Sequence, residues 1–432
     1  MKDKSRLIDT AKNYVIVLLF ISSVFLLFKA VICTPGSVNE SLSKLFGDSP
    51  SESNVNSPDN VSSGNAASPV FILTTTENGP HYAVKYGSQS KEKMISQFSS
   101  YLGEALGTAG TLKEVSAKQW QEALKGTGVF FDYLYPQPLS AIASWLGYET
   151  KGEIDSKTAR RLFLGNNDGK LVLYFISAGE GKIFSCSTER SFSSLSPKIA
   201  ECPIGTAKFA FELGNEFSKL DPYFIFSHES GTMRAITVSP PQGESFDALS
   251  LVGFFGMNRH AVLDYKKTNG SEVYVDGEKI LSIDKKSNEI IFSVTGNNGI
   301  YINSDSGTLS ITDCISSCYQ IVKNSIALTS GDGVLGLVSV TGSPSSCSIN
   351  FGYFVDGIPV ILPNGGYAAS FQISEGTIVK ATLNCRKYTF SGGTILALPE
   401  KQATAIAASK GGETILTYED KTDSVGCSWI FN

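Results

Sequence analysis

An almost uninterrupted apolar run, YVIVLLFISSVFLLFKAVIC, occupies residues 14–33 and constrains this chain more than any other feature. As a helix that rises ~1.5 Å per residue, the run would be about 30 Å long, which matches the hydrocarbon core of a bilayer. Its single charge, Lys29, lies near the far end, where a lysine side chain can reach the membrane interface. We therefore predict a single transmembrane helix at residues 14–33.

The residues on either side of the run predict its orientation. Cationic residues precede it: Lys2, Lys4, Arg6 and Lys12. Because cationic flanks stay in the cytoplasm, residues 1–13 are expected to form a cytoplasmic tail, and the bulk of the chain is expected to lie outside the cell membrane. Ile32 stands where a lipoprotein signal needs a small residue, so lipidation of Cys33 is not expected. Cleavage beyond Thr34 or Gly36 is the alternative to an uncleaved anchor.

The segment that follows the anchor, residues 34–67, is rich in Ser, Asn, Gly and Pro and poor in large apolar side chains. Such a segment cannot bury enough surface to offset its ordering entropy, so we predict a disordered tether. The remaining chain has the apolar and aromatic content of a folded protein, 42% and 11% over the whole sequence. The mild net charge of −5 and the lack of later basic stretches argue against a nucleic-acid partner.

Residues 68–432 alternate between helix and strand patterns, which favours an α+β fold with antiparallel sheets and helices. A hairpin is expected at residues 70–84, a capping box at Ser116 and Gln119, and a buried strand at residues 129–133. Near the end, residues 379–385 alternate as a half-buried strand. A helix is expected over residues 400–409, and its inward side chains are expected to be Ala403, Ile406 and Ala407.

The turn-rich sequence around Pro240 to Gly243 predicts a domain boundary. We expect an N-terminal domain at residues 68–240, a middle module at 244–306 and a C-terminal module at 307–432. The last two each begin with a helix and continue into strands around a Val-Asp-Gly turn, at residues 275–277 and 355–357. This similarity fits a duplicated module, and it also fits two unrelated hairpins.

Seven cysteines lie beyond the anchor, and their scattered spacing is not that of a disulfide framework. Cys186 and Cys202 flank a short Ser-rich segment and are the best candidates for a disulfide; the alternative is that the cysteines are buried small apolar residues. Cys314 and Cys318 are four apart on an expected helix, where a disulfide is disfavoured. With no CxxC pair and only isolated histidines, no metal or cofactor is expected.

A catalytic function finds no support in the sequence, which contains no HExxH, GxSxG or Walker A motif. His81 and His228 are interpreted as surface or hydrogen-bonded structural residues rather than general bases. We therefore expect a protein that is not an enzyme.

Three segments carry a resemblance to a known family. Residues 126–140, GTGVFFDYLYPQPLS, with Trp145 to Gly147 beyond them, resemble a segment of the YycH/YycI-type regulatory proteins. Residues 351–360, FGYFVDGIPV, with 366–369, GYAA, and residues 398–403, LPEKQA, resemble later parts of the same family. The order of anchor, tether and external α+β region also matches.

The resemblance implies a membrane-anchored accessory protein of a two-component system. Its expected partners are a membrane sensor histidine kinase and a sister protein of the same family, and its expected role is control of kinase activity in cell-wall homeostasis. It carries no catalytic residues. The small residues Ser22, Ser23 and Ala30 would offer a face for contact with kinase helices within the membrane. A module that binds a cell-envelope polymer or peptide is the alternative function.

Overall fold

The computed structural model describes residues 68–76, 79–86, 89–227, 232–240, 248–296, 298–304, 307–410 and 412–431. These residues all belong to one compact unit, Val61–Asn432. We call residues 68–227 the N-terminal lobe and residues 232–431 the C-terminal lobe. No helix among the described residues is both long and apolar enough to span a membrane, and the expected anchor and tether lie outside them.

The N-terminal lobe is built on a seven-stranded antiparallel sheet with the order β2-β1-β4-β5-β6-β7-β3. Its strands are β1 (Phe71–Thr75), β2 (His81–Lys85), β3 (Lys113–Val115), β4 (Gly128–Pro138), β5 (Thr158–Asn167), β6 (Lys170–Ser177) and β7 (Ile183–Ser191). Two short strands, β8 (Lys208–Phe209) and β9 (Ile225–Phe226), form a separate pair.

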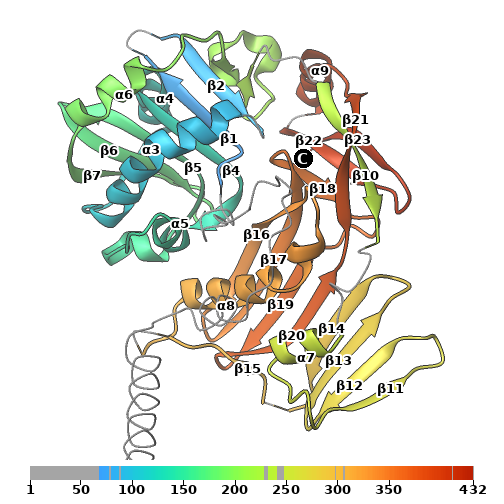
Figure 1. The fold of residues 1–432 in the computed structure, drawn as a ribbon. Helices are drawn as coiled ribbons and strands as arrows, with labels where there is room; N and C mark the ends of the chain where they lie inside the picture. The colour runs from blue at the N-terminus through green and yellow to red at the C-terminus, as the bar shows by residue number, and fades with distance from the viewer. Residues whose placement is uncertain are drawn as a thin grey trace, which may run out of the picture. The chain divides into compact units, whose positions relative to one another are not determined.

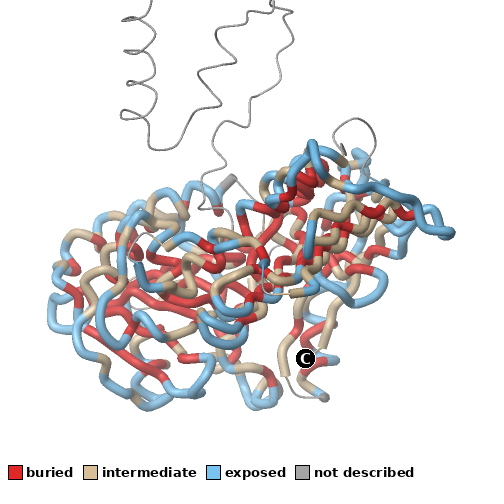
Figure 2. The backbone as a smooth tube through the Cα atoms, turned by 90° about the horizontal axis from the view of Figure 1, so that it is seen from below, coloured by how far each residue is buried: buried red, intermediate tan, exposed pale blue. Residues whose placement is uncertain are grey.

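Side chains alternate between the two faces of this sheet because successive strand residues point to opposite sides. On β4, Val129 and Phe131 join one apolar cluster while Phe130 joins another. The first cluster is covered by α3 (Gln89–Gly107), α5 (Leu139–Trp145) and α6 (Ser196–Ala200), and the second by α4 (Ala117–Lys125). The central strands β1, β4 and β6 are therefore buried on both sides, and Figure 2 shows long buried stretches of chain inside the molecule.

The C-terminal lobe contains a twelve-stranded sheet whose main path is β11-β12-β13-β14-β20-β19-β17-β18-β22-β23, with β15 beside β20 and β16 beside β17. Every strand pair is antiparallel except β18 with β22. Its strands are β11 (Leu263–Lys266), β12 (Glu272–Asp276), β13 (Lys279–Asp284), β14 (Glu289–Val294), β15 (Ile300–Tyr301), β16 (Val334–Ser343), β17 (Ser346–Val355), β18 (Ile358–Ile361), β19 (Ala369–Ser374), β20 (Thr377–Asn384), β22 (Thr414–Asp420) and β23 (Val425–Phe431).

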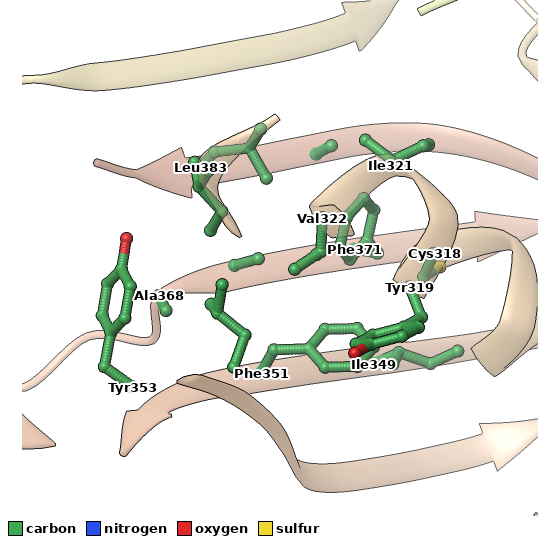
Figure 3. Packing of buried hydrophobic residues seen from close by; sticks show 14 of the residues in the cluster. Cys318, Tyr319, Ile321, Val322, Ile349, Phe351, Tyr353, Ala368, Phe371 and Leu383 are labelled. Carbon is green, nitrogen blue, oxygen red and sulfur yellow. The ribbon is translucent and has the colours of Figure 1, made fainter. Parts of the chain in front are cut away.

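A separate ribbon pairs β10 (Thr232–Ser239) with β21 (Lys387–Leu396), so the start of this lobe lies beside a late strand (Figure 1). Its helices are α7 (Ala248–Phe254), α8 (Ile311–Lys323) and α9 (Glu400–Lys410). Helix α8 begins with a capping box between Ser310 and Asp313 and is buried along one side. Figure 3 shows Tyr319 and Val322 of α8 facing Phe351 on β17, within the main core of the lobe.

Most of the expected elements are present. The hairpin forms as β1 and β2, the capping box at Ser116 and Gln119 is complete, and the fold is α+β with antiparallel sheets. The prediction for the inward face of α9 was partly wrong. Ala403 and Ala407 are fully buried, but Ile406 is 41% exposed. Thr404 takes the buried place, and its hydroxyl is satisfied by the carbonyl of Glu400 within the helix.

The sheet of the C-terminal lobe crosses the expected boundary between residues 306 and 307. Strand β14, from the middle module, pairs with β20, from the C-terminal module, over five residue pairs from Glu289 with Asn384 to Ser293 with Lys380. The two modules therefore share one sheet and one apolar core. Of the expected boundary at residues 240–243, only Pro240 lies within the described residues.

Candidate functional site at the junction of the lobes

Strand β4 is distorted where it carries a lone carboxylate. Asp132 interrupts an otherwise apolar sequence, and it is only 2% exposed. Its Oδ1 accepts a hydrogen bond from the backbone N–H of Leu134 at 2.8 Å, and Leu134 adopts a left-handed φ of 69°. The pairing with β5 shifts between Asp132 and Gln137. The distortion thus places the Asp132 carboxylate at a break in the sheet ladder, where it can receive side-chain donors.

Two adjacent arginines of β5 bind this carboxylate. Arg160 makes two hydrogen bonds to it, Nε to Oδ1 at 2.6 Å and Nη2 to Oδ2 at 2.9 Å. Arg161 lies opposite Asp132 in the strand register and donates from Nε to Oδ2 at 3.1 Å. Guanidinium groups suit this arrangement because their planar array of donors matches a carboxylate.

The other ends of the two guanidinium groups reach carboxylates from distant parts of the chain. Both bind Glu413, which precedes β22 in the C-terminal lobe; the Arg161 Nη2 to Oε1 distance is 3.1 Å. Arg161 also binds both oxygens of Asp221, at 2.8 and 2.9 Å. We call Asp132, Arg160, Arg161, Asp221 and Glu413 the junction network. It joins the sheet of one lobe to the last strands of the other.

The junction network is largely removed from water. The side chains of Asp132 and Arg161 are 3% and 6% exposed. Burial acts to raise the pKa of Asp132, but Arg160 and Arg161 outweigh it and hold that pKa below its usual value. The neighbouring carboxylates raise the pKa of Arg160 against the effect of burial. The two arginines therefore hold the Asp132 carboxylate in its charged form, and their own burial is compensated by the carboxylates that they bind.

A second buried ion pair crosses the same junction. The Nζ of Lys85, at the end of β2, lies 2.7 Å from Glu400 Oε1 at the start of α9 and 2.6 Å from the carbonyl of Ile225. Both side chains are buried, at 7% and 12% exposure. The ammonium also lies 5.2 Å from the centre of the Phe224 ring, a cation–π contact.

The three segments that resemble the YycH/YycI family meet at this junction. The first carries Asp132 and Tyr135 on β4, and the ring of Tyr135 packs edge-on against Phe354 of the second segment, with 6.3 Å between ring centres. The third contains Glu400, the partner of Lys85. Sequence reasoning found the segments but not the network, because its partners are up to 253 residues apart. The isolated Asp132 within apolar residues was the available signal.

Of the two histidines interpreted as surface or hydrogen-bonded residues, His81 lies within the described residues. His81 is 1% exposed, so it is a hydrogen-bonded structural residue and not a surface one. Its Nδ1 lies 2.8 Å from Thr75 Oγ1 and its Nε2 lies 3.0 Å from Glu212 Oε1. This order resembles a catalytic triad, but Thr75 is completely buried, and its hydroxyl also donates to the carbonyl of Leu124. Among the described residues, no group of three or more His, Cys, Asp or Glu side chains is arranged to hold a metal ion. His228 lies outside the described residues.

The expected disulfide between Cys186 and Cys202 does not form, since both are free thiols. Cys186 lies on β7 and faces the core, where its thiol points to the carbonyl of Leu173. Cys202 follows α6, and its thiol turns back to the carbonyl of Lys198. Cys314 and Cys318 on α8 are also free, as expected, and the Cys314 thiol points to the carbonyl of Pro344.

Alkylation of the purified protein without reductant will therefore find Cys186 and Cys202 as thiols. Burial raises the pKa of the Cys186 thiol to about 12, so this residue will react slowly in the native protein and fully after denaturation. Half-buried Cys202 will react faster. Mass spectrometry of the digested protein measures both. Recovery of a linked Cys186–Cys202 peptide would contradict the structure.

The expected membrane-helix contact residues, Ser22, Ser23 and Ala30, lie outside the described residues. Within the described residues, the junction network and the Lys85–Glu400 pair are charged groups that join the two lobes.

Comparison with known proteins gives one likeness in fold. No family model matches the chain, and no curated protein matches it. The crystal structure of YycH from Bacillus subtilis is similar, with a TM-score of 0.53 and 11% sequence identity over 85% of this chain and 95% of the YycH chain. At this identity the similarity concerns the fold, and the chain accordingly has a YycH-like α+β fold.

Proposed function

We propose that this protein is a membrane-anchored, non-enzymatic regulator that modulates a membrane sensor histidine kinase of a two-component system controlling cell-wall homeostasis. A sister protein of the same fold is the second proposed partner. Residues 14–33 anchor the chain with its N-terminus in the cytoplasm, and the two lobes lie outside the membrane.

The observation that carries this proposal is the agreement between two separate likenesses. Short segments of the sequence resemble the YycH/YycI family, and the fold is similar to that of YycH over 85% of the chain. The segments are also the ones that meet at the junction of the lobes. A signal that changes the fit between the lobes would pass along the tether to the anchor, where helices associate by close packing.

Replacing residues 14–33 with an unrelated apolar helix of equal length is expected to abolish control of the kinase. The lobes are expected to fold still, because each has an apolar core built from its own described residues. The measurements are transcription from a promoter under the kinase's control and the amount of membrane-associated protein. A matched control replaces only Ser22, Ser23 and Ala30 with leucine, which keeps the anchor but removes its small-residue face. Unchanged kinase output with the foreign helix would refute the anchor as the point of contact.

The partner itself is identified by crosslinking in intact membranes. Capture of a histidine kinase or of a sister protein supports the proposal. Capture of wall enzymes alone would contradict it and would favour the envelope-binding alternative.

A further inference from the structure

Strand β11 forms an outer edge of the twelve-stranded sheet (Figure 1), and among the described residues it pairs with a strand on one side only, β12. All four residues of β11 are exposed. Leu263 and Tyr265 point to the same face of the strand and are 72% and 52% exposed. An uncovered edge strand that carries apolar side chains is a place where a further strand can join the sheet.

The pairing of β11 with β12 shows which backbone groups of β11 stay open. The N–H of Lys267, just after the strand, donates to the carbonyl of Ser271 at 2.9 Å. In an antiparallel pair every second residue directs its N–H and C=O groups to the partner strand, so residues 263, 265 and 267 direct theirs to β12. Asp264 and Lys266 therefore direct their backbone groups to the open edge.

The side-chain charges of β11 favour one way of pairing two copies of the strand. Two antiparallel copies must bring their open backbone groups face to face about a twofold axis. An axis at Asp264 or at Lys266 would place two like charges directly opposite each other, which is unfavourable. An axis at Tyr265 places Asp264 of each copy opposite Lys266 of the other. This register joins opposite charges twice, at the positions where the open backbone groups meet.

The lysine of this register is free to turn toward a second copy. The Nζ of Lys266 lies 3.6 Å from Glu272 Oε1, but the same oxygen already binds Lys285 at 2.9 Å. The Lys266 side chain is 75% exposed. On the other face of the strand, the Tyr265 rings of the two copies would lie beside each other and cover part of their exposed surface.

We propose that a second copy of this chain adds its β11 antiparallel to this edge, about a twofold axis at Tyr265. The two sheets become continuous, and Asp264 of each copy pairs with Lys266 of the other. A contact between two four-residue strands is small, so the pair is expected to be weak and to form where copies are locally concentrated. The inference does not depend on the proposed control of a kinase.

Cysteine crosslinking of the full-length protein in membranes tests the register. In the proposed pair, Tyr265 of one copy lies opposite Tyr265 of the other at a position without mutual backbone hydrogen bonds, where the Cα atoms are about 4.5 Å apart. Tyr265→Cys is therefore expected to form a disulfide-linked dimer when copper phenanthroline is added as the oxidant. Leu263→Cys is the matched control, since residue 263 is exposed on the same face. Its two copies would lie four residues apart along the strands, about 14 Å, which is beyond disulfide reach.

We expect at least fivefold more linked dimer from Tyr265→Cys than from Leu263→Cys. The parent protein gives the background from the native cysteines. Equal yields from the two variants, no dimer above this background, or a link from position 265 to a different protein in place of a second copy would overturn the proposal.

Charge reversal tests the two ion pairs. In the Tyr265→Cys protein, Asp264→Lys places lysines opposite each other and Lys266→Asp places carboxylates opposite each other, so each change is expected to reduce the linked dimer at least fivefold. When the two reversed chains are expressed together with different tags, opposite charges face each other again in both pairs. A linked dimer with one chain of each kind is then expected to recover. Its failure to recover, with both chains folded by thermal unfolding, would contradict this register.

Discussion

Substituting Arg161→Met is expected to destabilise the protein by about 3–5 kcal/mol, the usual cost of removing one partner from a buried ion pair. Arg161 is 6% exposed and binds Asp132, Asp221 and Glu413. The methionine keeps much of the apolar volume but leaves Asp132 and Glu413 with Arg160 alone. Asp221 loses its guanidinium partner. Urea unfolding of the purified protein, followed by circular dichroism, measures the loss.

The matched control is Lys182→Met, which also replaces a cation with methionine. Lys182 pairs with Glu114, but both side chains are about half exposed. Exposed pairs contribute about 0–1 kcal/mol, so this variant should unfold almost as the parent protein does. A loss at Arg161 as small as that at Lys182 would show that the junction network is solvated and adds little to stability.

The effect of Arg161→Met should also depend on pH. The folded-state pKa of Asp132 lies below its usual value because of Arg160 and Arg161, against the effect of burial. Its contribution to stability is therefore fully present above the unfolded carboxyl pKa of about 4. It is lost as the pH falls through the lower folded value. Arg161→Met has less of this contribution to lose. The difference in the free energy of unfolding between this variant and the parent protein should therefore narrow below about pH 4.

Gly331→Ala is the second substitution with a large expected effect. Gly331 has a left-handed φ of 65°, and a Cβ there would lie 2.3 Å from the carbonyl oxygen of Tyr388. Alanine therefore adds backbone strain and an overlap with backbone that a rotamer change cannot relieve. We expect a loss of roughly 2–4 kcal/mol in the free energy of unfolding. The overlap would also push apart the segment that places Asp332 against Tyr388, where the two are joined by a 2.8 Å backbone hydrogen bond.

Gly365→Ala separates the cost of backbone strain from the cost of the overlap with neighbouring atoms. Gly365 has nearly the same φ, 64°, but no atom lies within 4 Å of the added Cβ. Its alanine variant should lose only about 1–2 kcal/mol, the cost of the left-handed conformation. Thermal unfolding of the two variants under the same conditions measures the difference. Equal losses would mean that the loop at Gly331 moves away from Tyr388 without cost.

Local patterns in the sequence predicted most of the elements correctly. The capping box at Ser116, the hairpin at residues 70–84 and the alternating strand near residue 381 each depend on residues close together in the chain. The prediction that Ile406 faces inward was wrong because helical spacing defines the buried face of a helix only approximately. The backbone of α9 turns Thr404 inward instead.

The junction could not be predicted in the same way. Arg160 and Arg161 lie next to each other in the sequence, which usually indicates an exposed segment, yet they lie on a central strand. Their burial is compensated by Glu413, more than 250 residues later. No local pattern reports a partner at that distance. The disulfide prediction was wrong for a related reason: nearness in sequence between Cys186 and Cys202 does not bring their thiols together.

The position of Glu413 has a consequence for synthesis of the protein. The strands that carry Asp132, Arg160 and Arg161 leave the ribosome long before Glu413, which binds both arginines. Asp132 and Asp221 can already balance the two arginines at that stage, because both belong to the first lobe. Strands β22 and β23 come only after Glu413. Contacts of this sequence separation form slowly, so we expect the sheet of the first lobe to form before Glu413 joins it to the second.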